Sequence, residues 1–155
     1  MTAVFPGTFD TFTKGHLDIL KRAQKIFNNV TIAICASPSK HTYFSLEQRV
    51  EMVKKCVGND ENIEIIGFSG LLVDLLKDKK ALYLVRGVRN TLDCEYELEL
   101  TGMYRDFLPD LEIIMLPTSH EYSYISSSLI REIHKHGGDI SRYVPDEIVE
   151  YIKQQ

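Results

Sequence analysis

Five short apolar runs recur along the chain, and each has the pattern of a buried β-strand. They cover residues 3–5, 30–35, 63–66, 81–85 and 112–116. The run at 30–35 is apolar on both alternations, which is typical of a parallel strand covered on both faces. Because segments with helical spacing separate the runs, the pattern predicts an open α/β sheet of parallel strands.

The segments after the first two strands carry helix signals. Apolar residues recur every three or four positions over residues 17–27, and Ser45 and Gln48 have the spacing of a capping box. A capping box satisfies free N–H groups at a helix start, so a helix is predicted to begin just after Ser45.

The later helices are predicted from residues that favour helix ends. Candidate N-caps are Ser69, Thr91 and Ser126. A segment over residues 92–108 stops at a proline, and the helix after Ser126 is expected to end at the glycines 137–138. Pro145 suits the first turn of a C-terminal helix over about residues 145–153.

Length and composition bear on the domain organisation. The chain has 155 residues, 44% of them hydrophobic, and no linker or break in composition divides it. That is enough for one hydrophobic core, so residues 1–155 are predicted to form a single domain. The expected fold class is α/β: a doubly wound, Rossmann-like, five-stranded parallel sheet with helices on both faces.

Charge and cysteine content limit the kinds of partner that the protein is expected to bind and the compartment in which it is expected to act. Eighteen Lys and Arg against 22 Asp and Glu give a net charge of −4, which disfavours binding of nucleic acid through its phosphates. Apolar runs such as residues 113–116 are too short to span a membrane. Cys35, Cys56 and Cys94 form no C-x-x-C pair, so free buried thiols and a soluble, cytoplasmic protein are expected.

The loop after the first strand is the first candidate for binding chemistry. Residues 6–16 match neither the dinucleotide fingerprint nor the Walker loop, but they bring His16 to the first turn of a helix. Free N–H groups and the positive dipole end of a helix attract phosphate, and an imidazole N–H adds a directed donor. His16 is therefore a candidate phosphate ligand, unless it only caps its helix.

Three further strand exits carry polar groups suited to anions. Residues 37–40 follow the second strand, residues 86–89 leave the fourth, and a serine run at 126–128 opens the helix after the fifth. Each has an ordinary alternative: a solvated lysine, solvent-facing arginines or plain N-capping. Because the carboxyl ends of parallel strands share one edge, these loops together predict a polyphosphate site.

Two other kinds of site are not predicted. The sequence has no G-x-S-x-G elbow, so no covalent serine nucleophile is predicted. His134 and His136 lie on different faces of a helix, so they do not form a metal-binding pair.

Two short motifs resemble signatures of the nucleotidyltransferase superfamily. Residues 13–16, TKGH, match its T-x-G-H signature, and residues 125–131, ISSSLIR, match I-S-S-S-x-x-[RK]. The pairing is far more specific than either motif alone. Four further segments strengthen the likeness: 37–40, 44–49, 86–89 and 95–97. From Val4 to about Pro145, the chain resembles the family of bacterial phosphopantetheine adenylyltransferases.

The resemblance implies an enzyme of coenzyme A synthesis. Such an enzyme transfers the adenylyl group of ATP to 4′-phosphopantetheine and forms dephospho-coenzyme A and pyrophosphate. The resemblance also implies Mg²⁺ that arrives with ATP and is not held by protein side chains. It further implies a homohexamer built from two trimers and feedback binding of coenzyme A.

The resemblance also implies roles for individual residues. His16 would stabilise the α-phosphate in the transition state, and the other catalytic residues would be Thr8, Lys40 and Arg89. Phosphopantetheine would be bound by Thr8, Lys40, Leu72 and Arg86. ATP would be bound by Thr8, Phe9, His16, Gly87, Val88, Arg89, Glu97, Tyr122, Ser123, Tyr124, Ile125, Ser126, Ser127 and Ser128.

Two departures and two alternative functions remain open at this stage. Thr11 stands where the family usually has proline, and Tyr104, expected on a helix facing the cleft, stands where asparagine is common. The chain could instead be another adenylyl- or cytidylyltransferase, acting on nicotinate mononucleotide or an alcohol phosphate. It could also be a non-catalytic nucleotide-binding module or a flavodoxin-like domain, which would bind ATP without releasing pyrophosphate.

Overall fold

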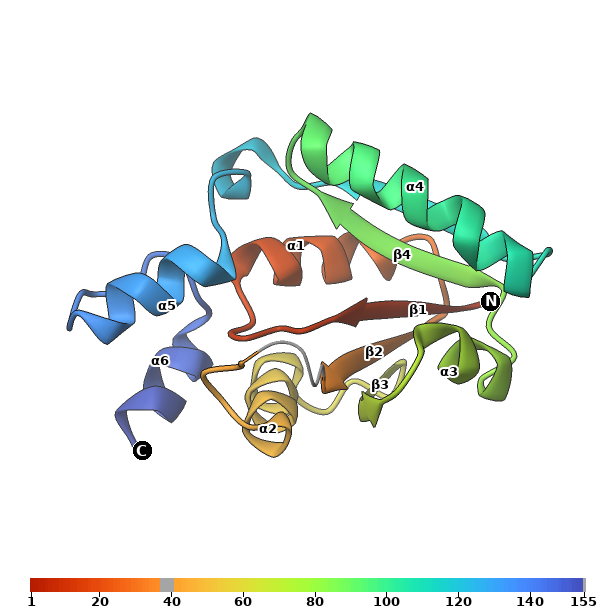
Figure 1. Ribbon diagram of the computed structural model, residues 1–155. Helices are drawn as coiled ribbons and strands as arrows, with labels where there is room; N and C mark the ends of the chain where they lie inside the picture. The colour runs from red at the N-terminus through yellow and green to blue at the C-terminus, as the bar shows by residue number, and fades with distance from the viewer. Residues whose placement is uncertain (37–40, 155) are drawn as a thin grey trace.

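The five predicted strands all form, and they pair in one parallel sheet (Figure 1). The computed structural model describes residues 1–36 and 41–154, so Lys40 and the rest of residues 37–40 lie outside the described residues. The strands are β1 (Thr2–Gly7), β2 (Asn29–Ala36), β3 (Ile63–Ser69), β4 (Tyr83–Val88) and β5 (Glu112–Pro117). Their order across the sheet is β3-β2-β1-β4-β5. The order therefore reverses between β1 and β4, where open α/β sheets bind their ligands.

Every strand extends past at least one end of its apolar run. β1 continues through Pro6 and Gly7, which align with Ala33 and Ile34 of β2. β4 begins two residues later than the apolar run and extends through Gly87 and Val88 beside β5. Parallel pairing uses backbone groups, so a ladder can continue past the last apolar side chain.

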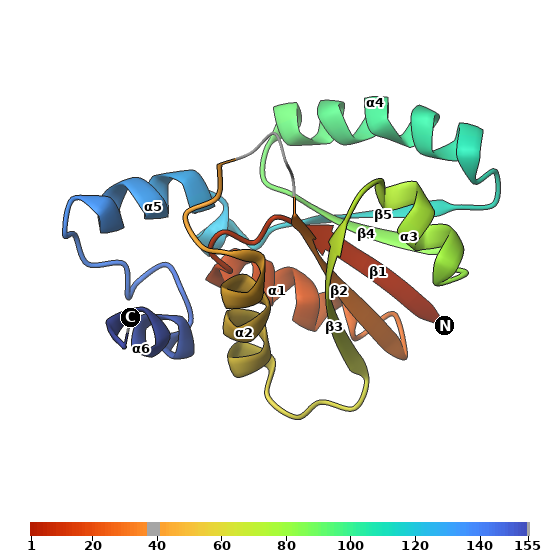
Figure 2. The same ribbon diagram turned by 60° about the horizontal axis from the view of Figure 1, so that its bottom comes forward.

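Helices cover both faces of the sheet, as predicted. They are α1 (Lys14–Ala23), α2 (Leu46–Val57), α3 (Leu72–Asp78), α4 (Thr91–Phe107), α5 (Ser127–Lys135) and α6 (Asp146–Lys153), with a short 3-10 turn, η1 (His120–Tyr122). α1 and α2 lie against one face, and α3 and α4 lie against the other (Figure 2). α5 and α6 lie beyond the carboxyl ends of the strands (Figures 1 and 2). This arrangement confirms a single Rossmann-like α/β domain.

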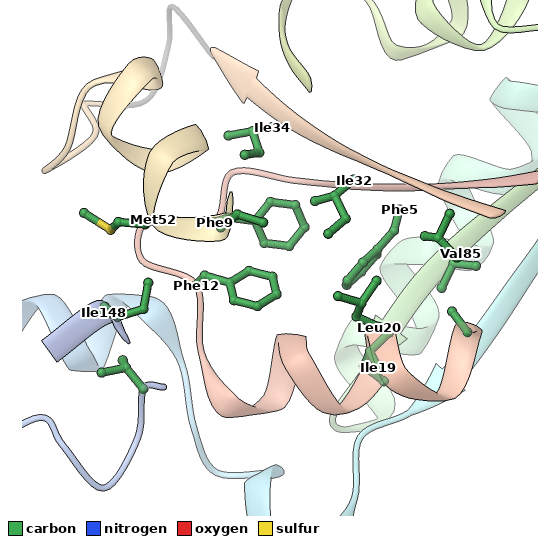
Figure 3. Close-up of a cluster of buried hydrophobic side chains, with 14 of the residues drawn as sticks. Phe5, Phe9, Phe12, Ile19, Leu20, Ile32, Ile34, Met52, Val85 and Ile148 are labelled. Carbon is green, nitrogen blue, oxygen red and sulfur yellow. The ribbon is translucent and has the colours of Figure 1, made fainter. Parts of the chain in front are cut away.

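The larger part of the core lies between the sheet and α1, α2, α5 and α6. Figure 3 shows the rings of Phe9 and Phe12 packed beside Ile32 and Ile34 of β2, with Met52 of α2 nearby. The smaller part lies under α3 and α4 and includes Val4, Ala33, Leu76, Ala81, Leu84 and Leu111. Burial of apolar area on both faces drives the sheet to the middle of the domain.

Two of the four predicted helix N-caps are present in the structure, and two are not. Ser45 and Gln48 form the predicted capping box, with the Gln48 N–H donating to Ser45 Oγ at 3.2 Å. Ser126 caps α5 as predicted. The prediction for Ser69 is wrong, because Ser69 ends β3 and α3 starts without a side-chain cap. Asn90 caps α4 in place of Thr91, because its amide oxygen accepts from the Asp93 N–H at 2.9 Å.

The structure also tests the expectations of free buried thiols and of no membrane-spanning segment. Cys35, Cys56 and Cys94 are free thiols, but they are only partly buried. Burial raises the pKa of the Cys56 thiol to about 12, which leaves it protonated and unreactive at neutral pH. Within the described part of the chain, no helix combines the length and apolar character needed to cross a membrane.

Candidate functional site

A cavity of about 710 Å³ opens where the sheet order reverses, at the carboxyl ends of β1 and β4. One wall is formed by residues 5–10, at the end of β1 and just after it, and by Thr13, Gly15 and His16 at the start of α1. The opposite wall is formed by β4 and the start of α4, and one side is closed by Thr118, Tyr122, residues 125–128 and Arg131. The chain therefore brings three of the four predicted loops together, and the fourth, residues 37–40, lies outside the described residues.

Most of the predicted site residues line this cavity. They are Thr8, Phe9, His16, Arg86, Gly87, Arg89, Glu97, Tyr122, Ile125, Ser126, Ser127 and Ser128. Four others do not: Leu72, Val88, Ser123 and Tyr124. Leu72 packs instead against the core beneath α3, and the Val88 carbonyl accepts from the Thr118 N–H at 2.8 Å. Tyr124 is exposed, with its ring edge-on to Tyr143. The structure thus separates these four side chains from the cavity wall.

His16 is held by the same contacts that start its helix. Thr13 and His16 form a capping box, in which Thr13 Oγ1 accepts from the His16 N–H at 3.2 Å. In return, the Thr13 N–H donates to His16 Nδ1 at 3.0 Å. Nδ1 must therefore be unprotonated, and the neutral ring carries its proton on Nε2. Capping and ligand binding are thus compatible, because the cap uses one ring nitrogen and leaves Nε2–H as a donor.

The surroundings of His16 keep it neutral. Burial, together with the positive charge of Arg89, lowers the pKa of His16 to about 4. At neutral pH the ring is therefore an uncharged hydrogen-bond donor and cannot act as an acid with a pKa near 7. A donor of this kind can stabilise charge that develops on a phosphate oxygen.

Aromatic rings pack beneath the imidazole. The Phe9 ring lies edge-on to the His16 ring, with 5.0 Å between centroids, and the Phe12 ring lies 5.5 Å from it. Phe9 is only 3% exposed, so its side chain belongs to the core and only its backbone can meet a ligand. A Cβ built on Gly7 would lie 2.7 Å from the Phe9 ring. Glycine at that position thus lets the ring tuck under the end of β1.

Asp10 fixes the rest of the loop between β1 and α1. Its carboxylate is 2% exposed and accepts from the N–H groups of Tyr43 at 2.8 Å and Phe44 at 3.1 Å. Arg131 forms an ion pair with Asp10 at 3.6 Å and also donates to the Asp10 carbonyl. Sequence reasoning gave neither residue a role. Arg131 could have been found, because it ends the motif at residues 125–131, and Asp10 lies in the loop that leads to the motif at residues 13–16.

The two arginines of the opposite wall are paired with carboxylates from α4. Arg86 Nε donates to Glu97 Oε2 at 2.7 Å, and a second guanidinium nitrogen donates to Oε1. Arg89 Nε donates to Asp93 Oδ2 at 2.9 Å, and its Nη2 donates to Oδ1 at 3.2 Å. Partial burial acts to raise the pKa of Asp93, but the hydrogen bonds from Arg89 outweigh it and leave that pKa below its usual range. Asp93 also lines the cavity, and sequence reasoning missed it.

The serine run at the start of α5 is partly used by the fold. Ser126 Oγ accepts from the Leu129 N–H at 3.2 Å, as an N-cap does. Ser127 Oγ donates to the Thr11 carbonyl at 2.9 Å, and Ser128 Oγ accepts from Arg131 at 3.1 Å. The Ser127 bond joins α5 to the loop between β1 and α1, and the other two lie within the start of α5. The helix start still lines the cavity and offers its N–H groups to an anion.

The two departures from the resembled pattern sit away from the reacting wall. Thr11 is buried, and its hydroxyl donates to Met52 Sδ at 3.4 Å. Tyr104 lies on α4, whose first turns line the cavity as expected, but Tyr104 itself is partly buried against the core beneath α4 and does not line the cavity.

Among the described residues, the cavity is lined by hydrogen-bond donors and cations, and Thr13 Oγ1 lies 3.2 Å from His16 Nδ1. No serine hydroxyl is hydrogen-bonded to an imidazole in the ranges 1–36 and 41–154. Within the same ranges, no three His, Cys, Asp or Glu side chains are grouped as metal ligands.

A family model described as cytidylyltransferase-like matches residues 4–133. That match spans all five strands, the cavity walls and Arg131.

Proposed function

This chain belongs to the cytidylyltransferase-like family of nucleotidyltransferases, and we propose that it transfers the adenylyl group of ATP to 4′-phosphopantetheine. The products are dephospho-coenzyme A and pyrophosphate, in the synthesis of coenzyme A. The observation that carries the proposal is His16, a neutral donor with a fixed tautomer at a helix N-terminus inside the cavity. The resemblance of the chain to bacterial phosphopantetheine adenylyltransferases supports the choice of both substrates.

The proposed reaction is a single in-line displacement. A phosphate oxygen of phosphopantetheine attacks the α-phosphorus of ATP and forms the new P–O bond. The bond from the α-phosphorus to the bridging oxygen breaks, and its electron pair leaves with pyrophosphate. The attacking phosphate is already an anion, so the reaction needs positioning and charge stabilisation more than a general base.

Different cavity residues position the substrates and stabilise the charge that develops in the reaction. His16 Nε2–H donates to an oxygen of the α-phosphate as its charge grows in the transition state. Arg89 and the N–H groups at the start of α5 stabilise the departing pyrophosphate. Thr8 and Arg86 hold the attacking phosphate, together with Lys40 as the resemblance implies. Leu72, which the resemblance also implies for phosphopantetheine, packs against the core and is given no role here.

Mg²⁺ enters this proposal with ATP. The carboxylates of Asp10, Asp93 and Glu97 line the cavity, but each is engaged by backbone N–H groups or by an arginine. Phosphate oxygens of ATP are therefore the better ligands for the ion. When bound there, Mg²⁺ neutralises negative charge on the phosphates that approach one another.

We also propose that the chain acts in the cytoplasm as a homohexamer of two trimers, with coenzyme A as a feedback ligand. Support for self-association comes from α4, where Leu92, Met103 and Phe107 are exposed. Large apolar groups in one region of a surface favour burial against another protein.

Pyrophosphate release tests the proposed function. The wild-type chain is incubated with Mg²⁺ and either ATP or CTP, with 4′-phosphopantetheine, nicotinate mononucleotide or no acceptor. Release only with ATP and phosphopantetheine is expected. Release only with CTP or only with nicotinate mononucleotide would keep nucleotidyl transfer and overturn the substrates. ATP binding without release from any acceptor would overturn catalysis itself.

A further inference from the structure

Arg49 is the largest fully buried side chain in the described part of the protein, and it does not line the cavity. We propose that Arg49 is a positioning residue, whose guanidinium holds the backbone after β1 in the shape that the attacking phosphate requires. The inference deepens the proposed function and rests on it for the identity of that phosphate.

The guanidinium joins three segments that are distant in sequence. Arg49 Nη1 donates to the carbonyl of Thr8 at 2.6 Å and to the carbonyl of Cys35 at 2.8 Å. Its Nε donates to the carbonyl of Phe44 at 3.2 Å. Thr8 follows β1, Cys35 lies near the end of β2, and Phe44 precedes α2. One side chain thus fixes the spacing of the loops that flank the cavity.

Asp10 completes the connection from the opposite direction. The Phe44 carbonyl accepts from Arg49, while the Phe44 N–H donates to Asp10. Thr8 and Asp10 are therefore tied to the same peptide segment through an arginine and a carboxylate. Both charged groups are 2% exposed, so their hydrogen bonds are shielded from competition with water.

The Thr8 carbonyl explains why this hold affects the reaction. A carbonyl oxygen that turned toward an incoming phosphate would repel it, whereas N–H and hydroxyl groups attract it. Arg49 binds the Thr8 carbonyl and so keeps that oxygen from turning toward a phosphate, while Thr8 itself lines the cavity. The buried positive charge also favours an anion nearby without touching it.

The Arg49→Lys variant distinguishes a role of Arg49 in positioning the loop after β1 from a role in protein stability alone. Lysine keeps the charge but cannot hold three carbonyls with the planar geometry of a guanidinium. We expect kcat to fall by about 30-fold or more, with KM for ATP within about 3-fold of wild type, because among the described residues Arg49 makes no hydrogen bond to the wall of β4 and α4 that holds the phosphates of ATP. Arg105→Lys is the matched control, since Arg105 is a surface arginine that also donates to a carbonyl, that of Leu111.

A second measurement does not depend on any reaction. Hydrogen exchange of the amides in residues 7–13 is compared between the wild type, Arg49→Lys and Arg105→Lys, each without ligand. We expect faster exchange, by about 10-fold or more, in that segment of Arg49→Lys alone. If the wild type releases no pyrophosphate with any acceptor, the proposed function fails, while this exchange experiment still tests the hold on the loop.

Several outcomes would overturn the inference. One is a folded Arg49→Lys variant with kcat within about twofold of wild type, and another is unchanged exchange in residues 7–13. If Arg49→Lys does not fold, the neutral Arg49→Gln is judged by the same criteria, because it leaves no buried charge unpaired. Failure of both variants to fold would make Arg49 a determinant of folding and overturn a specific positioning role.

Discussion

The two walls of the cavity are held in contrasting ways. The wall from β1 to α1 is fixed by groups with almost no exposure, Asp10 and Arg49, and by the capping box that orients His16. The wall of β4 and α4 is held by two ion pairs that differ in exposure. The side chains of Arg89 and Asp93 are 36% and 27% exposed, whereas Glu97, the partner of Arg86, is only 7% exposed. The contrast with the first wall therefore rests on the Arg89–Asp93 pair, which water or a ligand can reach.

This difference suggests a division of labour within one site. Buried hydrogen bonds cannot be exchanged for water, so the first wall keeps its donors in place as a reaction proceeds. Partly exposed ion pairs contribute about 0–1 kcal/mol each, so a phosphate can take the place of Asp93 on Arg89 at little cost. The first wall should therefore control kcat, and the second should control the binding of ATP.

Replacement of His16 is expected to have the largest effect. His16→Ala removes the one neutral donor of the fixed wall, and kcat should fall by about 100- to 1,000-fold, or about 3–4 kcal/mol. Steady-state pyrophosphate release measures the loss. His136→Ala, at an exposed histidine, is the matched control. More than half of the wild-type activity in His16→Ala would contradict the assignment.

The low pKa of His16 also predicts a dependence of stability on pH. The folded chain holds this pKa at about 4, against 6.5 for an unperturbed histidine, so between these values only the unfolded state is protonated. The contribution of neutral His16 to the free energy of unfolding should therefore be fully present above about pH 6.5. The free energy of unfolding should fall by up to about 3 kcal/mol as the pH drops toward 4. Urea unfolding of the wild type and of His16→Gln measures the difference. Equal pH slopes in the two proteins would contradict a buried neutral His16.

Gly7 tests whether the fixed wall depends on close packing. In Gly7→Ala, the new methyl group would meet the Phe9 ring at 2.7 Å, which requires the ring under His16 to shift. Overpacking of this kind costs about 1–3 kcal/mol, and kcat should fall with it. Gly102→Ala on α4 is the control, because a Cβ there meets nothing within 4 Å. A stable Gly7→Ala variant with wild-type kcat would show that the ring is not held tightly.

Asp93 tests the wall of β4 and α4 and should have the smallest effect. Asp93→Asn removes the negative charge that competes with phosphate for Arg89, so KM for ATP should fall by about 2- to 5-fold while kcat stays within about twofold. Steady-state kinetics with varied ATP measures both constants. A rise in KM would instead mean that Asp93 is needed to aim Arg89 at the nucleotide.

The sheet and the gathering of the motif residues could be predicted because both depend on local pattern. Buried parallel strands produce apolar runs, and the carboxyl ends of those strands place His16, Arg86 and Arg89 at one edge. Pairing of the arginines could not be predicted, because it depends on how α4 packs over β4. Arg49 was missed for the same reason: its three carbonyl partners are brought to it by the folding of α2 against the sheet.

The stereochemistry at the α-phosphorus tests the central claim most directly. ATP made chiral by sulfur at the α-phosphate is converted with 4′-phosphopantetheine, and the configuration of the dephospho-coenzyme A product is determined. A single in-line displacement, assisted by His16 and requiring no covalent intermediate, predicts inversion. Retention would reveal two successive displacements through a nucleotidyl-enzyme and would contradict the account.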